Sequence, residues 1–182
     1  MIESKFLKDN IQNIQKLLSI PPLKNFETKS LRQLLRLSKI REYSHGELII
    51  KEGDMDPWLF FLLSGKIRVE KEKVEIGIFD KIGEIFGEMR ILDGLGRSAS
   101  VYAEGKIVCL AVDTSATNRL GSEDEKANFL LLLYRMFAEY VSARLRLTND
   151  ELIQSKRIAK RLLKETGGKP VGYSAYNQTA TS

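Results

Sequence analysis

Apolar residues recur at helical spacing near both ends of the chain and in short alternating runs between them. Within residues 1–20 they predict an amphipathic helix, which the Pro21–Pro22 pair would end because proline lacks the N–H that a helix needs. The apolar positions of this helix are Ile11, Ile14, Leu17 and Leu18. A second helix, capped by Thr28 or Ser30, is expected to run to about Arg41.

From residue 42 onward, short apolar runs alternate with turn residues, as in sheets whose strands recur every 8–12 residues or so. Strands are expected at 47–51, 58–63, 66–70, 74–79, 98–103 and 107–112. A single helical turn is expected at 88–92. The predicted fold class is mainly β with flanking helices (α+β): an antiparallel β-roll or jelly roll, with N-terminal helices and a long C-terminal helix.

From about Asn118 apolar residues again recur at helical spacing. From Val141 onward, apolar or small residues follow one another at alternating steps of four and three. This heptad seam consists of Val141, Leu145, Thr148, Leu152, Ser155, Ala159 and Leu162. Such a seam packs on its own domain or on a second copy, and we expect a homodimer through the C-terminal helix. The expected organisation is N-terminal helices at 1–41, a roll at 42–117, C-terminal helices at 118–164 and a flexible tail at 165–182.

The composition excludes several classes of function. No apolar run approaches the roughly 20 residues of a membrane span, and the first residues lack the apolar core of a signal peptide. A cytoplasmic location is therefore expected. Cys109 and His45 are the single cysteine and histidine, which leaves no internal disulfide and no visible nucleophile–base pair. We expect neither an enzyme nor a metal site, and no cofactor.

Positive charge is concentrated at the C-terminal end. The net charge is +5, and residues 151–182 carry six Lys or Arg against two acids. A basic end can meet nucleic acid or an anionic surface. It can also be an ordinary solvated helix face, and the sequence favours that interpretation.

The stretch Gly83–Val101 combines four glycines with Glu88, which directly follows Gly87, and with Arg97, which three small residues follow. Glycine lets the main chain approach a ligand closely, and a guanidinium suits phosphate. Open backbone N–H groups after Arg97 add to an anion site. Because a carboxylate repels phosphate, Glu88 is expected to face another part of the ligand, such as sugar hydroxyls. The stretch therefore predicts a site for a phosphorylated sugar.

In this setting the stretch resembles the phosphate-binding cassette of cyclic-nucleotide-binding domains, the superfamily of the catabolite activator protein and of protein kinase A regulatory subunits. The matching marks are Phe86-Gly87-Glu88-Met89-Arg90 and Arg97-Ser98-Ala99, with Gly46, Glu52-Gly53-Asp54, Leu63-Ser64-Gly65 and Gly83 upstream. The resemblance covers roughly residues 20–160. Arg90 departs from the alanine or glycine that is usual in the family, and this departure bears on the identity of the ligand.

The resemblance implies a role for each residue of the site. Arg97 would pair with the cyclic phosphate, and Ser98 and Ala99 would donate their N–H groups to it. Glu88 would accept a hydrogen bond from the ribose 2′-OH, with Gly87 close to the sugar.

Residues outside the cassette would complete the site. Val69, Gly77 and Ile78 would form its apolar wall. Thr148 would contact the adenine amino group, and Asn149 would reach the base in the partner subunit. This arrangement favours cAMP over cGMP.

The implied function is that of a non-catalytic receptor, which signals through movement of its C-terminal helix and through a partner or dimer surface. The chain after Leu163 is too short for a helix-turn-helix domain, so the resemblance is to the stand-alone bacterial type. One alternative is a nucleic-acid-binding subunit of a transcriptional regulator, acting through the basic C-terminal helix. Another is a scaffold with a degenerate pocket.

Overall fold

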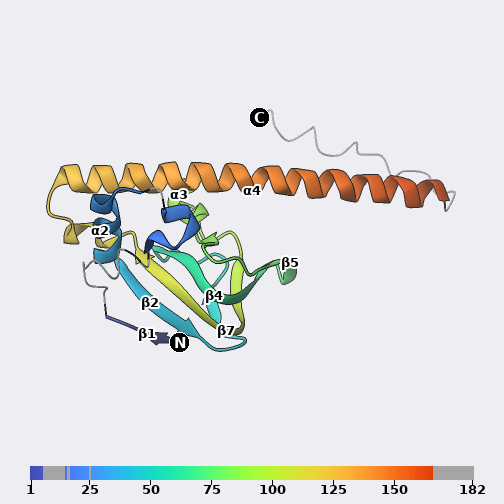
Figure 1. Cartoon of the computed structure of the whole chain (residues 1–182). Helices are drawn as coiled ribbons and strands as arrows, with labels where there is room; N and C mark the ends of the chain where they lie inside the picture. Colours follow the sequence, from blue (N-terminus) through green and yellow to red (C-terminus); the bar gives the residue numbers. More distant parts are fainter. Residues whose placement is uncertain (6–14, 16, 25, 166–182) are drawn as a thin grey trace. The chain divides into compact units, whose positions relative to one another are not determined.

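The computed structural model describes residues 1–5, 15, 17–24 and 26–165 (Figure 1). It divides the chain into two compact units, Met1–Tyr140 and Val141–Ser182. The first unit contains the sheet and the helices that pack on it. The described part of the second unit is the distal half of the last helix.

All strand pairs of the first unit are antiparallel. The strands are β1 (Ile2–Glu3), β2 (Ser38–Tyr43), β3 (Leu48–Ile50), β4 (Trp58–Lys71), β5 (Val74–Phe79), β6 (Ile85–Phe86) and β7 (Ser100–Asp113). They lie in the order β1-β2-β7-β4-β5, with β3 on β7 and β6 on β4. The predicted antiparallel β-roll with flanking helices is confirmed.

The described helical elements lie between β1 and β2, between β6 and β7, and after β7. They are η1 (Pro21–Leu23), α2 (Thr28–Arg36), α3 (Met89–Asp93), η2 (Ala116–Arg119) and α4 (Glu123–Glu165). The single turn expected at 88–92 corresponds to α3, and the long C-terminal helix corresponds to α4.

The second predicted helix is shorter than expected. It ends at Arg36 rather than about Arg41, because Ser38–Tyr43 pairs with residues 107–112 of β7. The hydroxyl of Ser38 donates to the carbonyl of Leu34 at 2.6 Å, which satisfies a carbonyl at the helix end. Sheet pairing therefore overrides the helical spacing of the last apolar residues.

Two pairs of runs that were predicted as separate strands each lie in one continuous strand. The runs 58–63 and 66–70 both lie in β4, and the runs 98–103 and 107–112 both lie in β7. β4 bends through register shifts on both sides of Ser64 instead of ending there. At the bend, Gly65 has φ = +90°, and a Cβ built on it would lie 2.5 Å from the carbonyl oxygen of Lys106. Glycine thus marks a bend here and not a turn.

The first predicted helix is described only at its end. Residues 15, 17 and 18 are helical, and Leu17 is buried. Ile11 and Ile14 lie outside the described residues. The predicted tail began at residue 165, but α4 includes Glu165, and the rest of that tail, 166–182, lies outside the described residues.

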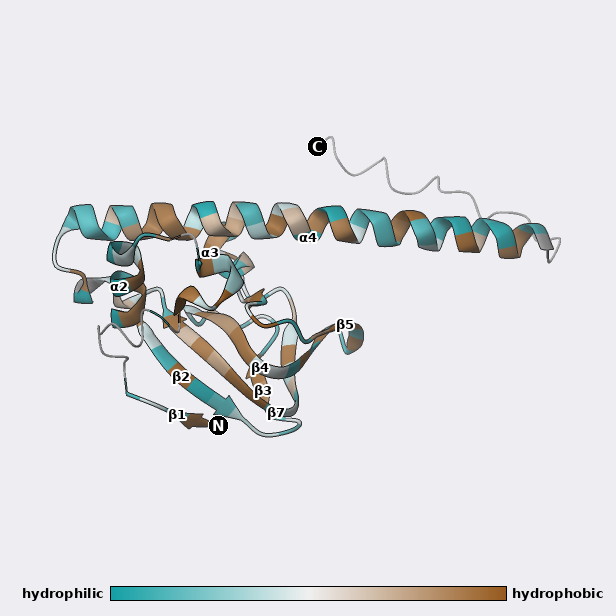
Figure 2. Cartoon of the chain, in the orientation of Figure 1, coloured by the Kyte–Doolittle hydropathy of each residue, from teal (hydrophilic) through white to brown (hydrophobic). Residues whose placement is uncertain are grey.

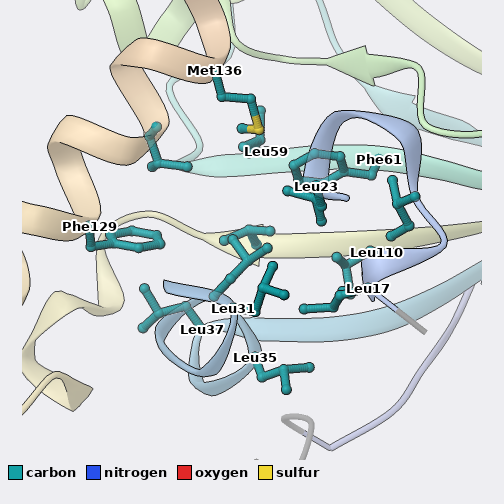
Figure 3. Close-up of a cluster of buried hydrophobic side chains, with 14 of the residues drawn as sticks. Leu17, Leu23, Leu31, Leu35, Leu37, Leu59, Phe61, Leu110, Phe129 and Met136 are labelled. Carbon is teal, nitrogen blue, oxygen red and sulfur yellow. The ribbon is translucent and has the colours of Figure 1, made fainter. Parts of the chain in front are cut away.

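One apolar core lies between the sheet and the helices. It gathers the buried leucines of η1 and α2, strand residues such as Phe61 and Leu110, and the proximal part of α4 (Figure 3). From α4 it takes Phe129, Leu133, Met136 and Phe137, whose spacing places them on one face of the helix. Burial of each such side chain stabilises the fold by about 1.5–3 kcal/mol. This face fixes the proximal half of α4 on the first unit.

A second core fills the inside of the roll. It contains Phe60 and Phe86, whose rings stack at 5.0 Å, together with Val69, Val101 and Cys109. Burial raises the pKa of the Cys109 thiol to about 12, so the thiol stays protonated inside this core. Figure 2 colours the apolar runs of β4 and β7 brown, and these runs contribute side chains to both cores. Among the described residues, no helix has the length and apolar character that a membrane span requires.

Candidate functional site

Arg97 is held at the centre of the predicted site. Its side chain is buried, and the residue is 3% exposed. The guanidinium donates from Nε and Nη2 to the carboxylate of Asp56 at 3.0 and 2.6 Å, and from Nη1 to the carbonyl of Gly87 at 2.6 Å. Nη2 also donates to the carbonyl of Trp58. The bond to Gly87 joins the two halves of the cassette.

Asp56 is a part of this site that the sequence analysis did not identify. Burial raises the pKa of its carboxyl, but the hydrogen bond and the charge of Arg97 outweigh this effect, so the pKa is lowered overall. The pair is therefore ionised at neutral pH. No local sequence pattern links Asp56 to Arg97, because the turn that carries Asp56 lies about 40 residues before Arg97 in the chain.

Arg97 keeps one N–H group that can donate to a ligand. A guanidinium has five N–H groups, and the contacts above engage four of them, so one on Nη1 is left. Within the described residues, the backbone N–H groups of Ser98 and Ala99 donate no hydrogen bond. A free guanidinium N–H beside two open backbone N–H groups is suited to one anionic oxygen group.

The loop after Arg97 is fixed to the turn before β4. The N–H of Arg97 donates to the carbonyl of Asp54, and the N–H of Gly53 donates to the carbonyl of Arg97, both at 2.9 Å. Ser98 donates its hydroxyl to the sulfur of Met89 at 3.3 Å, which is a weak bond that a better acceptor can replace. The anion-binding groups are thus supported by rigid backbone contacts.

Gly87 is required where it stands. It has φ = +83°, and a Cβ built on it would lie 2.5 Å from Nη1 of Arg97 and 3.1 Å from the carbonyl oxygen of Trp58. Any side chain at this position would therefore push the guanidinium away. The glycine keeps the main chain in contact with Arg97.

Glu88 follows directly and is also buried, with 5% exposure. Its backbone is helical, and its carbonyl accepts from the N–H groups of Ile91 and Leu92 at the start of α3. The structure therefore brings Arg97 into contact with Gly87, the residue directly before Glu88. The buried carboxylate of Glu88 thus follows Gly87 in the chain, and the buried guanidinium of Arg97 bonds to the carbonyl of Gly87.

The predicted wall residues lie on different faces of the sheet. Val69 pairs with Val101 and with Gly77, and it belongs to the core inside the roll, beside Phe86. Ile78 pairs with Arg68 one position along, so its side chain points to the opposite face, where it is 53% exposed. The structure brings Val69 to the cassette, but not Ile78.

Two helices, α3 and α4, carry the remaining residues that the sequence singles out. Thr148 and Asn149 lie in the second unit, on α4, and both side chains are exposed. Arg90 lies in α3, partly buried, and its Nε is buried without a hydrogen-bond partner among the described residues.

The start of the cassette is also tied to α4. The hydroxyl of Tyr140 donates to the carboxylate of Glu84 at 2.7 Å, across 56 positions of sequence. Glu84 directly precedes β6, and Tyr140 is the last residue of the first unit. Ile91 of α3 packs on the same apolar core as Tyr140. The cassette and the helix are thus linked by one polar contact and by shared packing.

We expect Tyr140→Phe to lower the free energy of unfolding by about 1–3 kcal/mol, because it removes a hydrogen bond to a partly buried carboxylate. Urea denaturation measures the change. Tyr134→Phe is the matched control, since Tyr134 lies on the same helix and is 48% exposed. Equal stabilities of the two variants would show that the contact with Glu84 contributes nothing.

Comparisons with known proteins relate the segment that carries these residues to one domain family. Residues 40–124 match the family model of the cyclic nucleotide-binding domain. The chain is 34% identical over 125 residues to the cAMP-dependent protein kinase type II regulatory subunit of Drosophila melanogaster, covering 66% of this chain and 33% of that protein. It is 29% identical over 119 residues to cGMP-dependent protein kinase 2 of Mus musculus, covering 62% of this chain and 16% of that protein. The chain thus spans a third or less of these curated relatives.

The fold has counterparts among solved structures. A cyclic nucleotide-binding domain from Methylobacillus flagellatus superposes with a TM-score of 0.63 at 23% identity. The match covers 79% of this chain and 84% of that one. At this identity the likeness extends to the fold alone, and it includes nearly the whole of the other domain.

Proposed function

Because residues 40–124 belong to the cyclic nucleotide-binding domain family, we propose that this chain is a non-catalytic receptor for a cyclic nucleotide. The observation that carries the proposal is the buried pair of Glu88 and Arg97 on either side of Gly87. The guanidinium is held by Asp56, Gly87 and Trp58 and keeps one Nη1 hydrogen, while the carboxylate directly follows Gly87 in the cassette. A ligand with an anionic end and a hydroxyl-bearing end uses both.

The cyclic phosphate fits the anion-binding groups. Arg97 donates its remaining Nη1 hydrogen to a phosphate oxygen, while Ser98 and Ala99 donate their backbone N–H groups. Glu88 accepts from the ribose 2′-OH, and Val69 contacts the apolar face of the nucleotide. Asp56 holds the guanidinium in place during this binding, so it acts as a positioning residue.

We expect cAMP to bind more tightly than cGMP. The support is Thr148, whose hydroxyl interrupts the apolar seam of α4 and suits the amino group of adenine. Asn149 reaches the base from a second copy. The two curated relatives carry the names of cAMP- and cGMP-dependent kinases, so the family resemblance alone does not favour either nucleotide.

Isothermal titration calorimetry of the full chain tests the proposal. Titration with cAMP, cGMP and 5′-AMP should give binding heat with cAMP, a weaker response with cGMP and none with 5′-AMP. The linear nucleotide is a control for general anion attraction, since its phosphate carries the larger charge. Absence of heat from both cyclic nucleotides, with folded protein, would refute the function.

Signalling through a second copy is supported by the order of residues beside the seam on α4. With Leu145, Leu152 and Ala159 at the a positions of the heptads, Glu151 at a g position meets Lys156 at an e position of a parallel second copy. The next g–e pair is Ile158 with Leu163, both exposed in the single chain. Opposite charges and then apolar side chains therefore face each other in this register.

Substitution within the seam should separate the copies. We expect Leu152→Glu to elute as a monomer of 20.7 kDa, because two carboxylates would then meet in the apolar seam, while the unchanged chain elutes at twice this mass. Leu147→Glu is the matched control, since Leu147 is 59% exposed and lies off the seam. Size-exclusion chromatography with light scattering measures both. A monomeric unchanged chain, in the presence and absence of cAMP, would contradict the dimer.

A further inference from the structure

We propose that the distal half of α4 binds the phosphate backbone of a nucleic acid through one basic face. The face consists of Arg146, Arg157, Lys160, Arg161 and Lys164. All five side chains are exposed. At 3.6 residues per turn they fall within an arc of about 100°.

This basic face is distinct from the apolar seam. In the heptad described above its residues occupy b, c and f positions, which point outward from a two-stranded coiled coil. Pairing of two copies through the seam therefore leaves the basic face open on each copy. The face does not require the seam, however, because it is formed by a single helix.

Most cations of the face lack acidic neighbours. Arg157, Lys160 and Lys164 have no Asp or Glu three or four positions away on the described helix. Arg146 has Asp150, and Arg161 has Glu165, four positions further along the chain. Five cations therefore stand against two acids, and the face carries a net positive charge.

This cluster makes the isolated helix less stable. Arg157 with Arg161, and Lys160 with Lys164, are like-charge pairs at i,i+4, and each such pair destabilises a helix by about 0.2–0.5 kcal/mol. A row of anions along the face removes this cost. The chain thus gains helix stability when it meets a polyanion.

The spacing of the charges suits a duplex. Arg157 to Lys164 spans seven residues, or about 10 Å of helix axis. Duplex DNA carries one negative charge per about 1.7 Å, hence about six charges in that length. Four cations against about six phosphates can track a backbone without reading bases, so we expect binding that is independent of sequence.

Fluorescence anisotropy of the full chain with a labelled 20-base-pair DNA duplex tests this proposal. We expect micromolar binding at 50 mM KCl that weakens about 100-fold at 200 mM, as four phosphate contacts imply. The test variant carries Arg157→Gln, Lys160→Gln, Arg161→Gln and Lys164→Gln. We expect it to lose at least about 10-fold in affinity at 50 mM KCl.

The matched control removes the same charge from the first unit. It carries Lys51→Gln, Lys66→Gln, Lys81→Gln and Lys106→Gln, all of them exposed lysines. We expect it to bind within about 3-fold of the unchanged chain, and circular dichroism checks that both variants stay helical. Equal losses in the two variants would overturn the proposal, because net charge alone would then explain binding.

Two further outcomes would also overturn the proposal. One is the absence of duplex binding by the unchanged chain at 50 mM KCl. The other is binding to vesicles of phosphatidylcholine and phosphatidylserine without binding to the duplex, which would assign the face to a membrane. None of these measurements uses a cyclic nucleotide, so their outcome is independent of the receptor function.

Discussion

Arg97→Ala is expected to weaken cAMP binding at least about 100-fold in calorimetry. The substitution removes a charged donor to the phosphate, which is worth about 1.5–3 kcal/mol. It also releases the carbonyls of Gly87 and Trp58, which Arg97 now holds in place. The open N–H groups of Ser98 and Ala99 would then lose their fixed position, so the total loss should exceed that of one contact.

A second variant separates binding from folding. Arg97→Ala also leaves Asp56 without its ion-pair partner, so we expect a lower free energy of unfolding. The double variant Asp56→Ala with Arg97→Ala removes that unpaired carboxylate and should regain part of the stability in urea. It should regain none of the affinity. Recovery of binding in the double variant would show that Arg97 serves folding and not the ligand.

Glu88→Gln is expected to weaken cAMP binding by about 10- to 100-fold. The amide keeps the size of the side chain but replaces a charged acceptor of the ribose 2′-OH, and a hydrogen bond to a charged group is worth about 1.5–3 kcal/mol. Because Glu88 is 5% exposed, water cannot readily take the place of the carboxylate.

A ligand that lacks the hydroxyl provides the control for Glu88. The unchanged chain should bind 2′-deoxy-cAMP much more weakly than cAMP, while Glu88→Gln should bind the two with similar affinity. Parallel losses for both ligands would instead mean that the variant disturbs the cassette as a whole. In that case Glu88 would not read the ribose.

The fold was predictable in class because the relevant signals are local. Alternating apolar runs indicated the antiparallel roll, and the spacing of apolar positions indicated α4. The end of α2 at Arg36 was not predictable from its own residues, because the strand from Ser38 exists only through pairing with β7, about 70 positions later. The continuity of β4 through Gly65 was missed for a related reason, since a glycine at a bend and one in a turn look alike in sequence.

The candidate site was predictable where it is contiguous. Gly87 and Glu88 stand next to each other, and Arg97 follows at the family spacing. Asp56 and Tyr140 were missed because their contacts, with Arg97 and with Glu84, join segments that only the folded chain brings together. The family resemblance implied Ile78 as a wall residue, but in a strand the register decides the face, and the sequence does not show that register.

The position of Trp58 has a practical consequence. It is the chain's single tryptophan, and its ring lies 3.7 Å from the guanidinium carbon of Arg41. Its backbone N–H donates to Asp56 and its backbone carbonyl accepts from Arg97, so the residue that carries the chromophore is hydrogen-bonded to both members of the ion pair. Intrinsic fluorescence excited at the indole therefore originates from one place, next to the anion-binding groups, and a nucleotide titration can be followed optically on the unlabelled protein.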